Sequence, residues 1–143
     1  MAITQGMCDS FKVQILSGQQ NLVSGGATYK LALYTSSATL SNATTAYTTL
    51  NEVSSSGSNY TAGGNTLTVS TSPTSTGNVA FMSFSNSSWT NANITANGAL
   101  IYNASKANRS IAVLDFGSDK TSADFTVVMP QNTATTALIR SSN

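Results

Sequence analysis

Acidic side chains are scarce in this chain, and three of its five lie close together near the C-terminal end. Asp115, Asp119 and Asp124 fall in the stretch VLDFGSDKTSADFTV at residues 113–127. Carboxylate oxygens bind hard cations such as Ca²⁺, so this cluster is a candidate cation site. Its spacing does not match the D-x-[DN]-x-[DN]-G calcium loop. We therefore expect a polar connection between two strands, in which Gly117 adopts unusual backbone angles and the charged side chains face water.

The commonest catalytic groups are missing from the sequence. The chain has no histidine and a single cysteine, Cys8, so Ser-His-Asp and Cys-His triads and a zinc ligand set are excluded. Asp115-Phe116-Gly117 spells the D-F-G of protein kinases, but the other kinase motifs are absent. Glu52 with one aspartate could form a glycosidase carboxylate pair, although nothing in the spacing favours it. The sequence therefore predicts a protein that is not an enzyme, with no catalytic, cofactor-binding or metal-binding residues.

Aromatic side chains offer an alternative, a module that binds sugars. Trp89, Tyr47 and Tyr60 could stack on sugar rings, as in lectin-like adhesion domains. A lone tryptophan in a β domain more often packs in the core, so we expect Trp89 to be buried. Cys8 lies in an apolar helical pattern, and we expect a buried, unreactive thiol.

The composition limits the partners that the chain can bind. Charged residues make up 8% of the sequence and the net charge is +1, against about 25% charged residues in an average domain. The six basic residues are scattered, so we expect no binding to nucleic acid or to anionic membranes. No signal peptide and no membrane-spanning run is expected. A surface rich in Ser, Thr and Asn is typical of extracellular and particle-forming β proteins, and also of ordinary soluble β domains.

An N-terminal helix is predicted over residues of about 3–17. An apolar residue stands at every fourth position from Ile3 to Ile15, and Gly18 suits the left-handed position that ends a helix. This apolar face could cover the sheet of its own domain or pack against a neighbouring subunit.

Beyond residue 27 the apolar period changes to two, which predicts strands. The predicted strand segments are 28–35, 65–72, 78–85, 87–95, 98–104, 110–116, 124–130 and 136–140. About eight short strands predict a mainly β protein, an antiparallel β-sandwich or jelly-roll-like domain. We expect one domain over residues 1–143, with a β-rich body at about 27–140 and a long polar loop at about 35–66.

Several segments, taken in order, resemble a family of small virion proteins from tailed bacteriophages. The segments are MAITQGMCDSFK, YKLALYTSSATL, AYTTLNEV, YTAGG, GALIYNASKANRSIAVLDFGSDKTS and DFTVVMP. The resemblance covers nearly the whole chain and departs from the family mainly at SSSGSN and in the Asn- and Ser-rich region 83–93. It carries no functional residues that can be transferred to this sequence.

The resemblance implies a virion structural protein, and within that class we expect a capsid decoration or cement protein. Its partner would be the major capsid protein, whose shell it would stabilise, and its location the capsid surface after synthesis in the host cytoplasm. We also expect a homo-oligomer, with a trimer as the first guess. The N-terminal helix and the loop at 35–66 are the expected contact regions. The alternative is a tail or fibre adhesion module that binds host-surface glycans.

Overall fold

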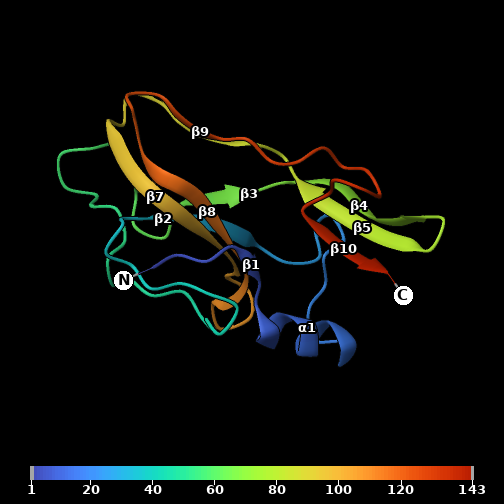
Figure 1. Ribbon diagram of the computed structural model, residues 1–143. Coiled ribbons are helices and arrows are strands. Elements are labelled where there is room, and N and C mark those ends of the chain that lie inside the picture. Colours follow the sequence, from blue (N-terminus) through green and yellow to red (C-terminus); the bar gives the residue numbers. More distant parts are fainter. Residues whose placement is uncertain (1, 143) are drawn as a thin grey trace.

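The computed structural model describes residues 2–142, which contain ten strands and one helix (Figure 1). The elements are β1 (Gly6–Met7), α1 (Asp9–Leu16), β2 (Tyr29–Tyr34), β3 (Asn65–Leu67), β4 (Val69–Thr76), β5 (Val79–Phe84), β6 (Ser87–Trp89), β7 (Ile94–Asn103), β8 (Arg109–Ser122), β9 (Phe125–Val127) and β10 (Ile139–Ser142). Strands account for 44% of the structure and helix for 6%. The prediction of a mainly β, sandwich-like domain with one helix is therefore confirmed.

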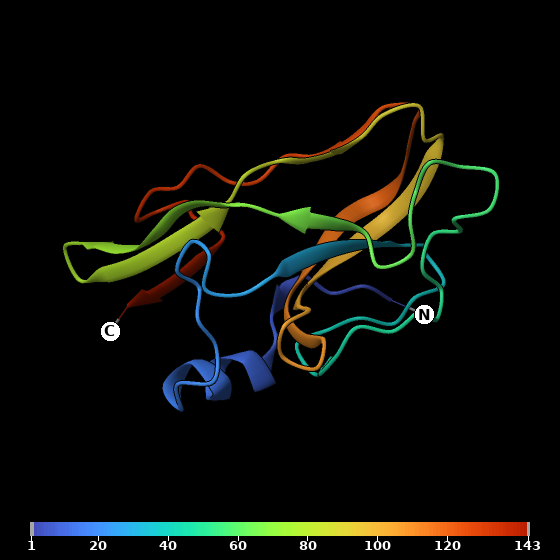
Figure 2. The same cartoon turned by 180° about the vertical axis from the view of Figure 1, so that it is seen from behind.

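The strands form three antiparallel sheets. The largest has the order β1-β8-β7-β2-β3, a second has the order β10-β5-β4, and β6 pairs with β9. The second sheet extends away from the largest one, while β9 runs along the top of the view and α1 lies at the bottom (Figure 1). The view from behind shows the same arrangement (Figure 2).

The core lies on the central strands β2 and β7. Consecutive residues of a strand point to opposite faces of the sheet, and Leu31, Ala32 and Leu33 of β2 are all fully buried. Leu100 and Ile101 of β7 are buried to the same degree. Both faces of the sheet are therefore covered at its centre.

The helix is shorter than the predicted range 3–17, because residues 2–8 are extended. The Thr4 N–H donates to the Leu40 carbonyl (2.8 Å) and the Cys8 N–H to the Ile111 carbonyl (2.9 Å). Ile3 packs against Gly98, where an added Cβ would lie 2.8 Å from the Ile3 side chain. The backbone N–H groups of Thr4 and Cys8 therefore bond to distant carbonyls and are not available for helical hydrogen bonds.

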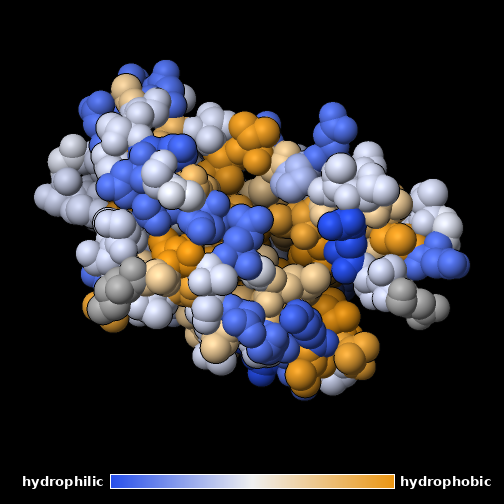
Figure 3. Space-filling view, viewed as in Figure 1, coloured by the Kyte–Doolittle hydropathy of each residue, from blue (hydrophilic) through white to orange (hydrophobic). Residues whose placement is uncertain are grey.

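The end of the helix agrees with the sequence pattern, but its apolar face does not. Gly18 has a φ of 75° and ends α1 as predicted. Phe11 is 1% exposed, whereas Ile15 is 40% and Leu16 is 89% exposed. Hydrophobic side chains accordingly gather on the surface over α1, at the bottom of the space-filling view (Figure 3). The domain itself therefore covers the predicted apolar stripe at Ile3, Met7 and Phe11, and leaves its C-terminal end at Ile15 exposed.

The prediction of a polar connection between the segments 110–116 and 124–130 is wrong, because β8 continues through most of the stretch between them. Gly98 of β7 pairs with Asp115, and Ala96 pairs with Lys120, so residues 116–119 bulge out opposite a single residue of β7. Gly117 has a φ of 82° at this bulge, as its predicted backbone angles required. A bulge lets a strand resume its pairing after an irregular segment. Asp115, Asp119 and Lys120 therefore sit on a long strand, and Asp124 follows its end.

The segment between Tyr34 and Asn65 contains no helix and no regular strand in the described chain. It is nevertheless attached to the sheet at several points by isolated bridges. The bridges pair Ile3 with Leu40, Tyr34 with Glu52, and Ala46 with Arg109. We refer to residues 35–64 as the long loop.

Candidate interaction surfaces

The three clustered aspartates do not converge on one point. Each carboxylate accepts a hydrogen bond from a different donor: Asp115 from the Gly117 N–H (2.8 Å), Asp119 from Asn97 Nδ2 (3.0 Å) and Asp124 from the Asn91 N–H (2.9 Å). Within residues 2–142, no group of three His, Cys, Asp or Glu residues is placed to hold a metal ion. The aspartates therefore order the local backbone and leave part of their charge at the surface.

Glu52 is a hydrogen-bonding anchor within the long loop. Its Oε1 accepts a hydrogen bond from the Tyr47 hydroxyl (2.7 Å). Its Oε2 accepts from the Tyr60 hydroxyl (2.5 Å) and from the Gly63 N–H (2.7 Å). All three hydrogen bonds come from residues of the long loop itself, so both oxygens of the Glu52 carboxylate are engaged in holding the loop.

The tyrosines around Glu52 are held in their protonated form. Burial raises the pKa of Tyr60 and of Tyr47, and the hydrogen bond to the Glu52 carboxylate raises both pKa values further. Burial also raises the pKa of Tyr102 to about 12. The Tyr102 hydroxyl donates to the Gly63 carbonyl (2.7 Å). The hydroxyls thus remain hydrogen-bond donors, and the cluster fixes the loop.

The aromatic residues considered for sugar stacking lie largely in the interior. Trp89 is 5% exposed and Tyr60 is 2% exposed, so the predicted burial of Trp89 is confirmed. Tyr47 stacks on Tyr102 with 4.6 Å between ring centroids, which covers one of its faces. Neither Trp89 nor Tyr60 presents a ring face to a sugar.

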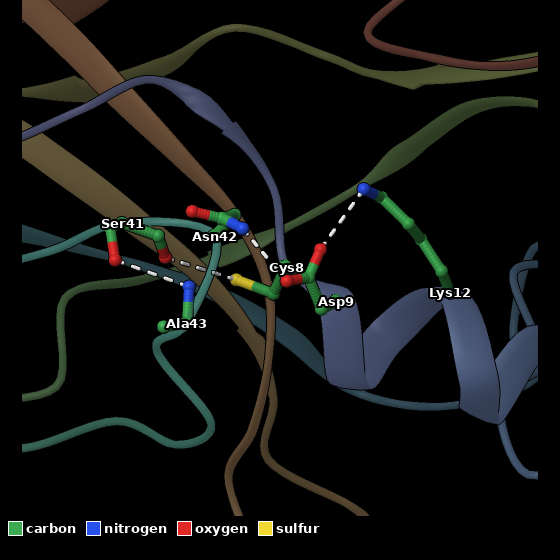
Figure 4. Close-up of polar contacts among 6 residues, drawn as sticks. All are labelled: Cys8, Asp9, Lys12, Ser41, Asn42 and Ala43. Atoms are coloured by element: carbon green, nitrogen blue, oxygen red, sulfur yellow. Dashed lines mark hydrogen bonds and ion pairs between the residues drawn. The ribbon is translucent and has the colours of Figure 1, made fainter.

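Cys8 is buried at the start of α1, as predicted (Figure 4). Its Sγ donates a weak hydrogen bond to the Ser41 carbonyl at 4.0 Å. Burial raises the pKa of the thiol, which lowers its thiolate fraction and its reactivity. Beside it, Asp9 accepts hydrogen bonds from Lys12 (3.1 Å) and from Asn42 Nδ2 (2.7 Å), so α1 is tied to the long loop.

The first candidate surface is the exposed tip of the long loop at Leu50. This side chain is 70% exposed. The next residue, Asn51, accepts a hydrogen bond from the Thr35 N–H (3.0 Å) and donates to the Ser37 carbonyl (3.1 Å). Glu52 follows with the bonds described above. An apolar side chain is therefore presented on a backbone that is already ordered.

The second candidate surface is a groove between α1 and the three-stranded sheet, with a volume of about 670 Å³. Its lining is mostly apolar and includes Phe11, Leu16, Phe81 and Ile139. Of the described residues that line it, Lys12 and Arg140 carry charge, and both are basic. We call this surface the basic face.

The third candidate surface is a groove of about 630 Å³ between the C-terminal part of β8 and the segment that contains β9. Its apolar lining includes Phe116, Phe125, Val128 and Leu138. Its charged lining consists of Asp115, Asp124 and Lys120. We call this surface the acidic face.

Comparison with known protein families, with curated proteins and with solved structures finds no match. None of the helices in residues 2–142 is long and apolar enough to cross a membrane.

The sequence predicted the long loop and the N-terminal helix as contact regions but did not predict the two grooves. One signal was present at α1: Val13 and Leu16 stand beside the four-residue stripe, and they are 65% and 89% exposed. The acidic face had no such signal, because its residues come together only through the pairing of β8 with β7 and the position of β9. The role of Glu52 as an anchor likewise has no signature in the sequence.

Proposed function

We propose that this chain is a virion structural protein, a capsid decoration protein that binds and stabilises the shell of the major capsid protein. The proposal joins the family resemblance of the sequence to one structural observation. Large apolar side chains are exposed at three separate places on a domain whose interior is well packed. They are Val13, Ile15, Leu16 and Val23 near α1, Leu50 on the long loop, and Val128 beside β9.

Several separate apolar surfaces suit a protein that touches several neighbours at once. Exposed hydrophobic patches commonly mark protein–protein contacts, and repeated weak contacts add avidity when many copies bind one lattice. The internal polar groups, by contrast, are largely consumed in ordering the domain. The arrangement favours adhesion to protein over chemistry on a small molecule.

The tip at Leu50 is the surface that we assign to the shell. Its backbone is ordered by Asn51 and Glu52, so little conformational entropy is lost when the tip is buried. Charged groups are absent from positions 48–51, so a contact made there depends little on ionic strength. A decoration protein that must hold under changing salt conditions gains from such a contact.

Binding to shells that lack the protein tests this proposal. Purified chain is mixed with such shells, and bound copies are counted after sedimentation and by cryo-electron microscopy. We expect saturable binding at a fixed number of copies per capsid subunit, and shells that rupture at a higher temperature. Leu50→Ser should weaken binding about tenfold. Leu67→Val, a conservative change at a buried position, is the matched control and should leave binding unchanged.

Two results would overturn the proposal. The first is that purified particles contain no copies of this chain. The second is that the wild-type protein does not bind the shells while its unfolding transition shows that it is folded.

A further inference from the structure

The basic and acidic faces lie on opposite sides of the chain where it enters β10. Leu138 lines the acidic face, and the next residue, Ile139, lines the basic face. Leu138 lies in the bend just before β10 and Ile139 begins the strand, so the chain passes from one face to the other here. In both views α1 lies at the bottom and β9 at the top (Figures 1 and 2). One molecule therefore cannot close its basic face against its own acidic face.

Each face combines an apolar centre with charge of one predominant sign. The basic face has Leu16, which is 89% exposed, next to Lys12 and Arg140. The acidic face has Val128, which is 73% exposed, next to Asp115 and Asp124. Both grooves have the size of pockets that receive ligands or groups of side chains, roughly 300–1,000 Å³.

The concentration of charge is notable because charge is rare elsewhere. The whole sequence has six basic and five acidic residues. Two of the basic residues line one groove and two of the acidic residues line the other. Lys12 is paired with Asp9 and Lys120 lies at the acidic groove, so the excess on each face is modest. Charge of this size sets the orientation of a contact, while apolar burial supplies most of its strength.

We propose that the occupant of the basic face is the acidic face of a second copy of this chain. The α1 side of one molecule, led by Leu16, packs on the β8–β9 groove of the next. Lys12 and Arg140 then lie opposite Asp115 and Asp124. Because the two faces differ, the contact is head-to-tail, and it generates a ring if the rotation closes and a filament if it does not. The contact uses neither Leu50 nor the tip of the long loop.

Two variants that each block one face test the head-to-tail arrangement. Leu16→Asp places a carboxylate where the acidic face would dock, and Val128→Lys places an ammonium where the basic face would dock. Both positions are exposed, so the fold should be retained, and thermal unfolding checks this. Mass is measured by analytical ultracentrifugation over a range of concentrations. We expect the wild type to assemble, and each variant alone to associate at least about tenfold more weakly.

Mixing the two variants gives the sharpest result. The Leu16→Asp chain keeps an intact acidic face and the Val128→Lys chain keeps an intact basic face, so the mixture should form one-to-one dimers and stop there. A wild type that stays monomeric at high concentration would overturn the inference. So would assembly that Leu16→Asp abolishes and Val128→Lys leaves intact, because that outcome indicates a two-fold contact of the basic face with itself.

A neutralising variant tests the role of charge. Asp115→Asn with Asp124→Asn keeps oxygen acceptors for the Gly117 and Asn91 N–H groups while it removes both charges. The wild-type contact should weaken when the ionic strength is raised to about 1 M, where the Debye length is about 3 Å. The neutral variant should associate more weakly and lose this salt dependence. An unchanged salt dependence in the variant would contradict the pairing.

These results separate the inference from the proposed function. Shell binding measured with Leu50→Ser does not depend on either groove. A chain that binds shells as a monomer would refute self-association alone, and a chain that assembles but ignores shells would refute the decoration role alone.

Discussion

At the Glu52 end of the molecule, a carboxylate and two tyrosine hydroxyls satisfy one another and a backbone N–H. At the α1 end, Leu16 is 89% exposed and Val13 is 65% exposed, with no apolar side chain of the same molecule to cover them. In the first region, polar groups form hydrogen bonds with one another inside the molecule. In the second region, apolar side chains remain exposed on the surface. The contrast shows that the two regions differ in how far their side chains find partners within the same molecule.

The largest expected effect comes from breaking the packing behind the Glu52 region at Gly64. A Cβ at this position would lie 1.7 Å from the Leu31 carbonyl oxygen, and φ is +79°. Gly64→Ala should therefore destabilise the protein by at least about 3 kcal/mol, and poor folding is expected. Denaturant unfolding measures the change.

Gly57→Ala is the matched control for the Gly64 change. Gly57 has nearly the same φ, +74°, and an added Cβ would meet nothing within 4 Å. Gly57→Ala should lower the free energy of unfolding by only about 1 kcal/mol, the cost of placing alanine in the left-handed backbone region. If the two substitutions destabilise the protein equally, close packing at Gly64 is not what matters.

The next largest effect is expected from removing the Glu52 carboxylate. Glu52→Ala leaves the Tyr60 and Tyr47 hydroxyls and the Gly63 N–H without their acceptor. Orphaned buried donors cost about 1–3 kcal/mol each, and partial access to water reduces the total, so we expect a loss of about 3 kcal/mol. Hydrogen exchange in the long loop should accelerate as well.

A background without the two hydroxyls provides the control. In a Tyr47→Phe, Tyr60→Phe protein, Glu52→Ala should cost less, because two of the three donors that it would orphan are already gone and only the Gly63 N–H remains. An equal cost in both backgrounds would mean that Glu52 stabilises the fold by some other route.

High pH perturbs the same region without a mutation. Burial raises the pKa of Tyr29 and of Tyr102 to about 12 from the ordinary 10.0, and the pKa values of Tyr34, Tyr47 and Tyr60 are raised as well. As the pH rises, the tyrosines therefore ionise in the unfolded chain before they ionise in the folded protein. The contribution of the protonated tyrosines to the free energy of unfolding is complete below pH 10 and is lost as the pH rises toward 12.

Each tyrosine should reduce the free energy of unfolding by about 1.4 kcal/mol per pH unit within that window. The absorbance of tyrosinate should appear together with the loss of the folded far-ultraviolet signal. Gradual ionisation near pH 10 in a chain that stays folded would show that the rings are more accessible than their burial indicates.

Most of the strands were visible in the sequence, since every predicted segment overlaps a strand of the structure. The errors fall at glycines. The segments 87–95 and 98–104 were predicted as separate strands, yet β7 runs through residues 94–103 and contains Gly98, where an added Cβ would lie 2.8 Å from the Ile3 side chain. Gly117 was read as part of a turn, yet it lies in a bulge of β8. A glycine inside a strand often marks close approach or a bulge, and sequence alone does not separate these from a turn.

The helix and the anchor show a different limit. Ile3 is buried as the four-residue pattern requires, but as extended chain, because its neighbours hydrogen-bond to residue 40. Glu52 meets Tyr60 and Gly63 only because the long loop folds back on itself. Both outcomes depend on contacts between distant residues, and a local pattern carries no information about them.

The smallest expected effect on stability sharpens the comparison within a single helix. Leu16→Ser changes a side chain that is 89% exposed, so the free energy of unfolding should move by no more than about 0.5 kcal/mol. Phe11→Ala, about one and a half turns earlier on α1, removes a side chain that is 1% exposed. It should lower the free energy of unfolding by about 3–5 kcal/mol. Both are measured by denaturant unfolding of dilute protein, where self-association does not contribute. A large loss from Leu16→Ser under these conditions would mean that this side chain already packs within its own molecule, and the α1 surface would then belong to the fold.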